Sequence, residues 1–134
     1  MVIQAKRFSG LTILAAACVL VCVATAIYPN KNATVSQILF GVAIATPLLA
    51  IPFLVLLHFG RKVVSPLFGG LFYAGMLAAL GWWCFVFWES FLVPENSDPQ
   101  NGLVFFFGPL YSAIAAAVAG KALVLLDARW NLPR

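Results

Sequence analysis

Long runs of apolar residues, separated by short polar segments, dominate the pattern along this chain. Four such runs lie near residues 9–28, 35–58, 67–88 and 103–126. Because a helix rises 1.5 Å per residue, each run is long enough to cross a hydrocarbon core about 30 Å thick. The pattern therefore predicts an all-α integral membrane protein, in which residues 1–134 form a single domain built as a bundle of four transmembrane helices.

The composition supports this class of protein. Of the 134 residues, 63% are hydrophobic and only 9% are charged, and the mean hydropathy is +1.02. A soluble domain needs far more polar surface than this chain supplies. Its positive net charge of +4 is then a topology signal and does not indicate a nucleic-acid partner.

The first apolar run has some features of a signal peptide. Lys6 and Arg7 precede it, and Ala24-Thr25-Ala26 resembles a small-residue cleavage site. The run is, however, longer than the usual apolar core of a signal peptide. We therefore expect an uncleaved first transmembrane helix.

Basic residues lie almost entirely at one end of the predicted bundle, which sets its orientation. Positive charge near helix ends stays preferentially on the cytoplasmic side, and only Lys31 falls on the other side. We expect both termini in the cytoplasm and the protein in the inner (plasma) membrane of a bacterium. The residues on the predicted inner side are Lys6, Arg7, Arg61, Lys62, Lys121, Arg129 and Arg134.

The opposite end carries acidic and aromatic residues. Glu89, Glu95 and Asp98 lie in or near a predicted outer loop at residues 93–102, whose Pro, Asn, Asp and Gly content is typical of turns. Tryptophan is enriched at membrane interfaces, where its ring lies at the headgroup level. The sequence thus predicts an aromatic belt at Trp82, Trp83 and Trp88.

Small residues recur at helical spacing in the last two runs. Such faces let membrane helices approach closely, and we expect most of them to close the bundle within one chain, with one left to meet another subunit as the alternative. Large residues opposite them, including Phe85 and Phe87, are expected to face lipid. The predicted packing residues are Gly108, Ser112, Ala116 and Gly120 in the fourth helix and Gly70, Ala74 and Ala78 in the third.

Prolines interrupt two of the predicted helices. Pro47 and Pro52 lie within the second run and Pro109 within the fourth. A proline inside a helix removes a backbone hydrogen bond and produces a kink. Because broken helices often line transport paths, Pro47 and Pro52 form a candidate hinge, although a kink that only shapes the bundle is the simpler interpretation.

Few side chains are suited to catalysis. His58 is the single histidine, and the three cysteines, Cys18, Cys22 and Cys84, all fall inside apolar runs. The sequence contains no glycine-rich phosphate loop, no metal-ligand cluster and no nucleophile with an adjacent base. We therefore predict no catalytic residues, no metal site and no cofactor, with bound lipid as the expected small-molecule component.

A basic group lies near the predicted inner boundary, made of His58, Arg61, Lys62 and Lys121. Such residues are suited to anionic lipid headgroups. Lys121 lies before the end of the apolar run, with Asp127 six residues further on rather than three or four. The lysine is expected to extend its flexible stem toward the boundary or to bind a lipid, with an acid of another subunit as the alternative partner.

These observations favour a non-catalytic function. We expect a small membrane subunit that packs through its small-residue faces into a larger membrane protein complex, in an accessory, assembly or stabilising role. Its partners would be membrane lipids and other membrane subunits or copies of itself. The alternative is a small homo-oligomeric transporter or channel that uses the proline-kinked second helix and Lys121.

Overall fold

The computed structural model describes residues 2–27, 34–89 and 102–131, and these residues form four long helices. They are α1 (Val2–Ile27), α2 (Val35–Gly60), α3 (Pro66–Phe87) and α4 (Gly102–Trp130). All four contain a segment long and apolar enough to cross a membrane. The predicted all-helical bundle with four candidate transmembrane helices is thus confirmed.

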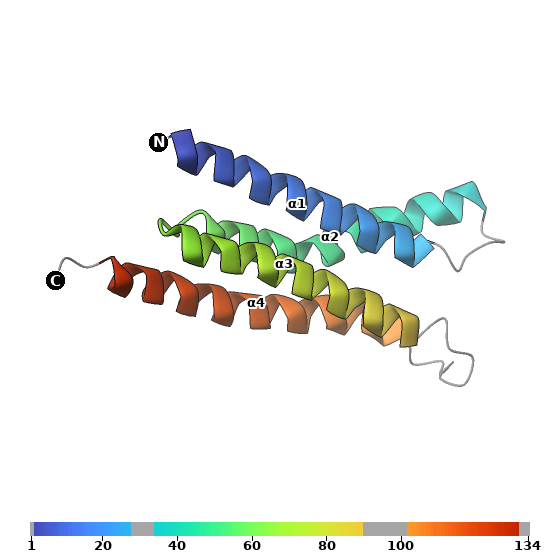
Figure 1. Cartoon of the computed structure of the whole chain (residues 1–134). Helices are drawn as coiled ribbons and strands as arrows, with labels where there is room; N and C mark the ends of the chain where they lie inside the picture. The colour runs from blue at the N-terminus through green and yellow to red at the C-terminus, as the bar shows by residue number, and fades with distance from the viewer. Residues whose placement is uncertain (1, 28–33, 90–101, 132–134) are drawn as a thin grey trace.

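The helices run alternately up and down along one common direction (Figure 1). The two ends of the chain lie at the same end of the bundle, beside the short connection between α2 and α3. The middle layer, formed by α2 and α3, separates α1 from α4. Because successive helices alternate in direction, α2 and α4 run parallel. The contact between these two helices is the most extensive in the bundle.

Two helices are longer than the apolar runs that predicted them. The first begins at Val2 instead of residue 9, and the fourth continues to Trp130 instead of ending at residue 126. Hydropathy marks only the part of a helix that suits lipid, whereas backbone hydrogen bonding continues into the charged ends. The predicted outer loop at residues 93–102 lies outside the described residues, apart from Gly102.

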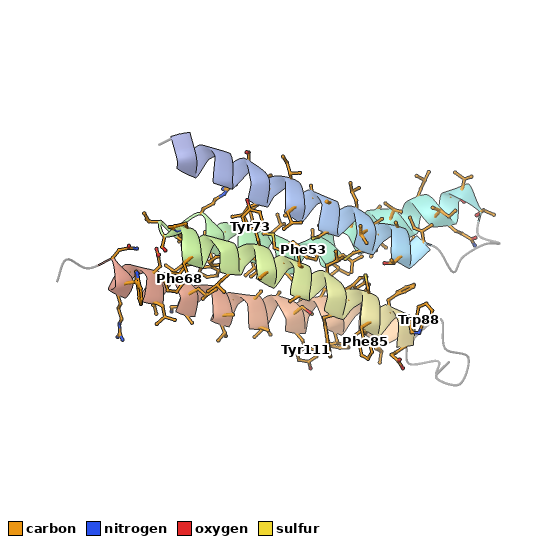
Figure 2. The ribbon with its side chains drawn as sticks, in the orientation of Figure 1. Phe53, Phe68, Tyr73, Phe85, Trp88 and Tyr111 are labelled. Carbon is orange, nitrogen blue, oxygen red and sulfur yellow. The ribbon has the colours of Figure 1, made fainter. Side chains whose placement is uncertain are left out.

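The core is built mainly by α1, α3 and the second half of α2. Its largest fully buried side chains include Phe53, Phe72 and Met76, which lie among small α1 residues such as Cys18 and Cys22. Along α1 the buried positions Leu11, Ala15, Cys18 and Cys22 repeat every three or four residues, as expected for one helix face. Figure 2 shows Phe53 pointing between the helices, whereas Phe85 and Trp88 point outward.

The first part of α2 lies outside this core. Its large side chains, including Val35, Leu39 and Phe40, are exposed, and its buried residues begin only at Leu49. The change occurs around Pro47, and in Figure 1 the first part of α2 turns away from the line of the rest of the helix. The proline kink predicted for α2 is consistent with this bend, while movement about it stays a prediction.

Candidate functional site

The helices α2 and α4 come close together where Phe59 packs against Gly120. A Cβ atom placed on Gly120 would lie 2.8 Å from Cδ2 and 3.0 Å from Cβ of Phe59. Only a residue without a side chain fits here, so Gly120 lets the two backbones come close. We call this the Phe59–Gly120 contact, and it fixes how α2 and α4 are aligned at the end of the bundle that holds both chain termini.

Basic side chains flank the Phe59–Gly120 contact. The ammonium nitrogen of Lys62 lies 5.4 Å from the centre of the Phe59 ring, a cation–π arrangement. The imidazole of His58 makes an edge-on contact with the Phe59 ring, and the two ring centres are 5.4 Å apart. Lys121 follows Gly120 directly and is exposed. The structure therefore places two of the four predicted basic residues, His58 and Lys62, against one aromatic ring. Lys121 adjoins the glycine that touches this ring, and Arg61, between His58 and Lys62 in sequence, is exposed.

Asp127 lies at the same end, but its environment is entirely different. It is the buried charged residue of the described chain, with 3% of its surface exposed. Its Oδ2 accepts a hydrogen bond from the backbone N–H of Val64 at 2.9 Å, and Oδ1 accepts one from the N–H of Ser65 at 3.1 Å. The Nδ2 of Asn131 donates a third, at 3.1 Å to Oδ1. Two of these three hydrogen bonds join the carboxylate to the connection between α2 and α3.

The physical reason is the start of α3. Ser65 is the N-cap of this helix and Pro66 its first residue, but the Ser65 side chain makes no capping hydrogen bond. Amides near a helix N-terminus lack partners within the helix, and the helix dipole makes that end positive. The carboxylate from α4 supplies both an acceptor and a negative charge. Sequence reasoning missed this role, although Asp127 follows Gly120 by seven residues and so lies on the same helix face.

A small cleft lies deeper in the bundle, where all four helices contribute. Its empty volume is about 260 Å³. Ser112 supplies its hydroxyl group, while the other lining atoms are mostly apolar. Both Pro52 of the kinked helix and Pro109 of α4 border it, together with Cys22, Phe53, Trp83 and Ser112.

Trp83 forms a polar link between α3 and α1. Its indole Nε1 donates a hydrogen bond to Oγ1 of Thr25 at 3.3 Å, and that hydroxyl donates to the Cys22 carbonyl at 2.8 Å. Trp83 is only 8% exposed, whereas Trp82 and Trp88 are 60% and 58% exposed. The predicted aromatic belt therefore keeps two of its three members on the surface, because the N–H of the third is used inside the bundle. Phe87, expected to face lipid, is also buried.

The two predicted small-residue faces differ in burial. On α4, Ala116 and Gly120 are buried and Gly108 and Ser112 half-buried, so this face packs within the chain. On α3, Gly70, Ala74 and Ala78 are all exposed, and a Cβ atom on Gly70 would meet nothing within 4 Å. Among the described residues of α3, Gly69 is the small residue that is buried, and Gly75 and Ala79 are partly buried.

The polar side chains of Tyr73, Tyr111 and Ser112 do not face one common cavity. Tyr111 points outward from α4 (Figure 2) and is exposed, whereas Ser112 borders the cleft. The Tyr73 hydroxyl lies against Gly10 of α1, where a Cβ atom would overlap it. Among the described residues no group of three His, Cys, Asp or Glu side chains is placed to hold a metal ion.

Comparisons with known proteins find no match for this chain among family models, curated proteins or solved structures.

Proposed function

We propose that this protein is a small non-catalytic subunit that packs, through an exposed face of α3, against a helix of another subunit in a larger membrane complex. Its role there would be accessory: assembly or stabilisation. Both termini would lie in the cytoplasm, because the basic residues gather at the end of the bundle where the chain begins and ends.

The observation that carries the proposal is the position of Gly70, Ala74 and Ala78. These residues form a smooth exposed line on α3, flanked by the large exposed side chains of Leu67 and Leu71. Small residues in membrane helices are enriched where another helix approaches closely, since dispersion contacts and interhelical packing drive association in lipid. On the other helix with such a line, α4, Gly120 does receive a neighbouring helix. The same spacing on α3 is suited to a helix from outside the chain.

The second candidate, a homo-oligomeric transporter or channel, has less support. A transport path needs polar groups facing a shared cavity, and the cleft between the four helices offers the Ser112 hydroxyl in a volume of about 260 Å³. The indole N–H of Trp83, which borders the same cleft, already donates to Thr25. The kinked α2 is the feature that favours this candidate.

The test is to purify the protein in a mild detergent and identify what remains bound, by native mass spectrometry. We expect heterologous membrane subunits in a fixed ratio to this chain. A discrete homo-oligomer without other subunits would contradict the proposal and favour the transporter.

Matched substitutions locate the contact. Ala74→Leu places a large side chain in the middle of the exposed α3 face and is expected to release the partner subunits while the chain itself stays folded. Ala115→Leu makes the same change at an exposed position of α4 and should leave the complex intact. If the α4 variant releases the partners and the α3 variant does not, the proposed face is wrong.

A further inference from the structure

The end of the bundle that carries Lys62 and Lys121 has a strong imbalance of charge. The acidic residues that the structure describes are Asp127 and Glu89. Glu89 belongs to the opposite end of α3, and Asp127 is buried under the α2–α3 connection, where its two oxygens accept three hydrogen bonds. Neither carboxylate is presented to the lysines on the surface. Both lysines are exposed, and their ammonium groups are thus available to an anion from outside the described chain.

The Phe59–Gly120 contact relates the two lysines through the backbone. Lys62 is one turn beyond Phe59 and holds its ammonium over the ring, while Lys121 is the residue after Gly120, which touches the same ring. Ser112 borders the cleft that all four helices share, and at 100° per residue Lys121 lies on the opposite face of α4 from Ser112. Lys121 is thus turned away from the cleft, toward the outer surface of the bundle, where it is exposed.

We propose that Lys62 and Lys121 together bind the phosphate group of an anionic phospholipid, with Phe59 as the apolar floor of the site. A lysine on a flexible stem can place its ammonium at the headgroup level while its methylene groups stay along apolar surface. Lys62 holds its charge over this ring and Lys121 follows the glycine that touches it, so a phosphate bound by both would accept charge-assisted hydrogen bonds from two ammonium groups. Exposed apolar side chains such as Val118 and Leu125 on α4 are available to the acyl chains.

The phosphate could come from a lipid headgroup or from free phosphate, and the position of Lys121 along its helix favours the lipid. Lys121 lies within the segment Phe107–Trp130, which is apolar enough to cross a membrane, so the anion must reach a position at the lipid boundary. A phospholipid already places its phosphate at that depth. This proposal does not depend on the proposed subunit contact, which uses α3.

The experiment measures lipid binding by native mass spectrometry, with the full chain in detergent and added phosphatidylglycerol or phosphatidylcholine of equal chain length. We expect a preference for phosphatidylglycerol. Lys62→Gln and Lys121→Gln should each weaken its binding about fivefold, because one basic residue near an anionic surface contributes that much. Lys121→Arg, which keeps the charge, should largely restore binding.

Arg129→Gln is the matched control, since it removes an exposed positive charge from the same helix away from the Phe59–Gly120 contact. It should change binding less than twofold. An equal loss in the Arg129 variant, or no loss in the lysine variants, overturns the proposal. So does a result in which inorganic phosphate binds but phosphatidylglycerol has no advantage over phosphatidylcholine, because the site would then take free phosphate.

Discussion

The carboxylate of Asp127 accepts a hydrogen bond from the backbone amide of Ser65, 62 residues earlier in the chain, at 3.1 Å. With the neighbouring bond from Val64, this joins the end of α4 to the start of α3. Burial of a carboxylate is costly unless hydrogen bonds compensate for the lost water. Asp127 is compensated by hydrogen bonds from these two amides and from Asn131, so one buried acid joins α4 to the start of α3.

Replacing Asp127 with alanine should destabilise the bundle by roughly 2–3 kcal/mol, because hydrogen bonds to a charged group are lost and two amides lose their acceptor. Asp127→Asn, which keeps one oxygen as an acceptor, should have an intermediate effect. Denaturant titration in mixed micelles measures both. Arg129→Ala, two residues further along, is the control and should stay within about 0.5 kcal/mol of the unmodified protein. Equal stability of the Asp127 and Arg129 variants would show that the cap contributes nothing.

Gly120→Ala should destabilise the protein by about 1–3 kcal/mol, since its new methyl group would overlap the Phe59 ring. Gly41→Ala, where a Cβ atom meets nothing within 4 Å, should be neutral or stabilising by up to roughly 1 kcal/mol. The same unfolding titration compares them. A smaller residue at position 59, in Gly120→Ala/Phe59→Leu, should recover part of the loss, and strict additivity of the two changes would contradict the direct contact.

Trp83→Phe removes the indole N–H that donates to Thr25 and should cost about 0.5–1.5 kcal/mol. Trp82→Phe, at an exposed neighbouring position, should have little effect. Tryptophan fluorescence gives an independent measurement, in which brominated lipids quench Trp82 and Trp88 strongly and Trp83 weakly. Because the chain has four tryptophans, single-tryptophan variants that also lack Trp130 separate the three signals. Strong quenching of Trp83 would mean that it faces lipid, as the sequence alone suggested.

The three cysteines should differ in their reaction with a membrane-permeant maleimide. Cys18 and Cys22 are each 1% exposed, whereas Cys84 is half-buried. Reaction of a thiol requires access as well as thiolate, so we expect one label per folded chain, at Cys84, and three after denaturation. Peptide mapping by mass spectrometry locates the label. Early modification of Cys18 would contradict the packing of α1.

Hydropathy alone predicts the four helices, because a segment that crosses lipid has to be apolar along its whole length. This requirement can be recognised in each segment separately. The start of α1 at Val2 and the end of α4 at Trp130 extend past this signal. The direction of a single side chain is a different matter. Trp82 and Trp83 are neighbours of one residue type, and only the position of Thr25 on another helix determines that Trp83 is the buried one.

The candidate site was predictable in part for a similar reason. The sequence groups His58, Arg61 and Lys62 by proximity, and it marks Lys121 as lacking an acid at its own depth. It does not show that Phe59 fits against Gly120, the residue before Lys121, or that Lys62 lies over the same ring. The small-residue lines on α3 and α4 look alike in sequence, yet Gly120 is buried and Gly70 is exposed. The difference arises because burial of a helix face depends on whether a neighbouring helix packs against it.

The Asp127 cap also sets an order of events during synthesis. Ser65 emerges from the ribosome long before the residue that will cap its helix, and at about 5–20 residues per second the interval is several seconds. Throughout that time α2 and α3 have to persist as a hairpin whose connecting amides are held by water at the membrane surface. Completion of α4 replaces that water with a carboxylate, so closure of this end of the bundle is a late step of biogenesis.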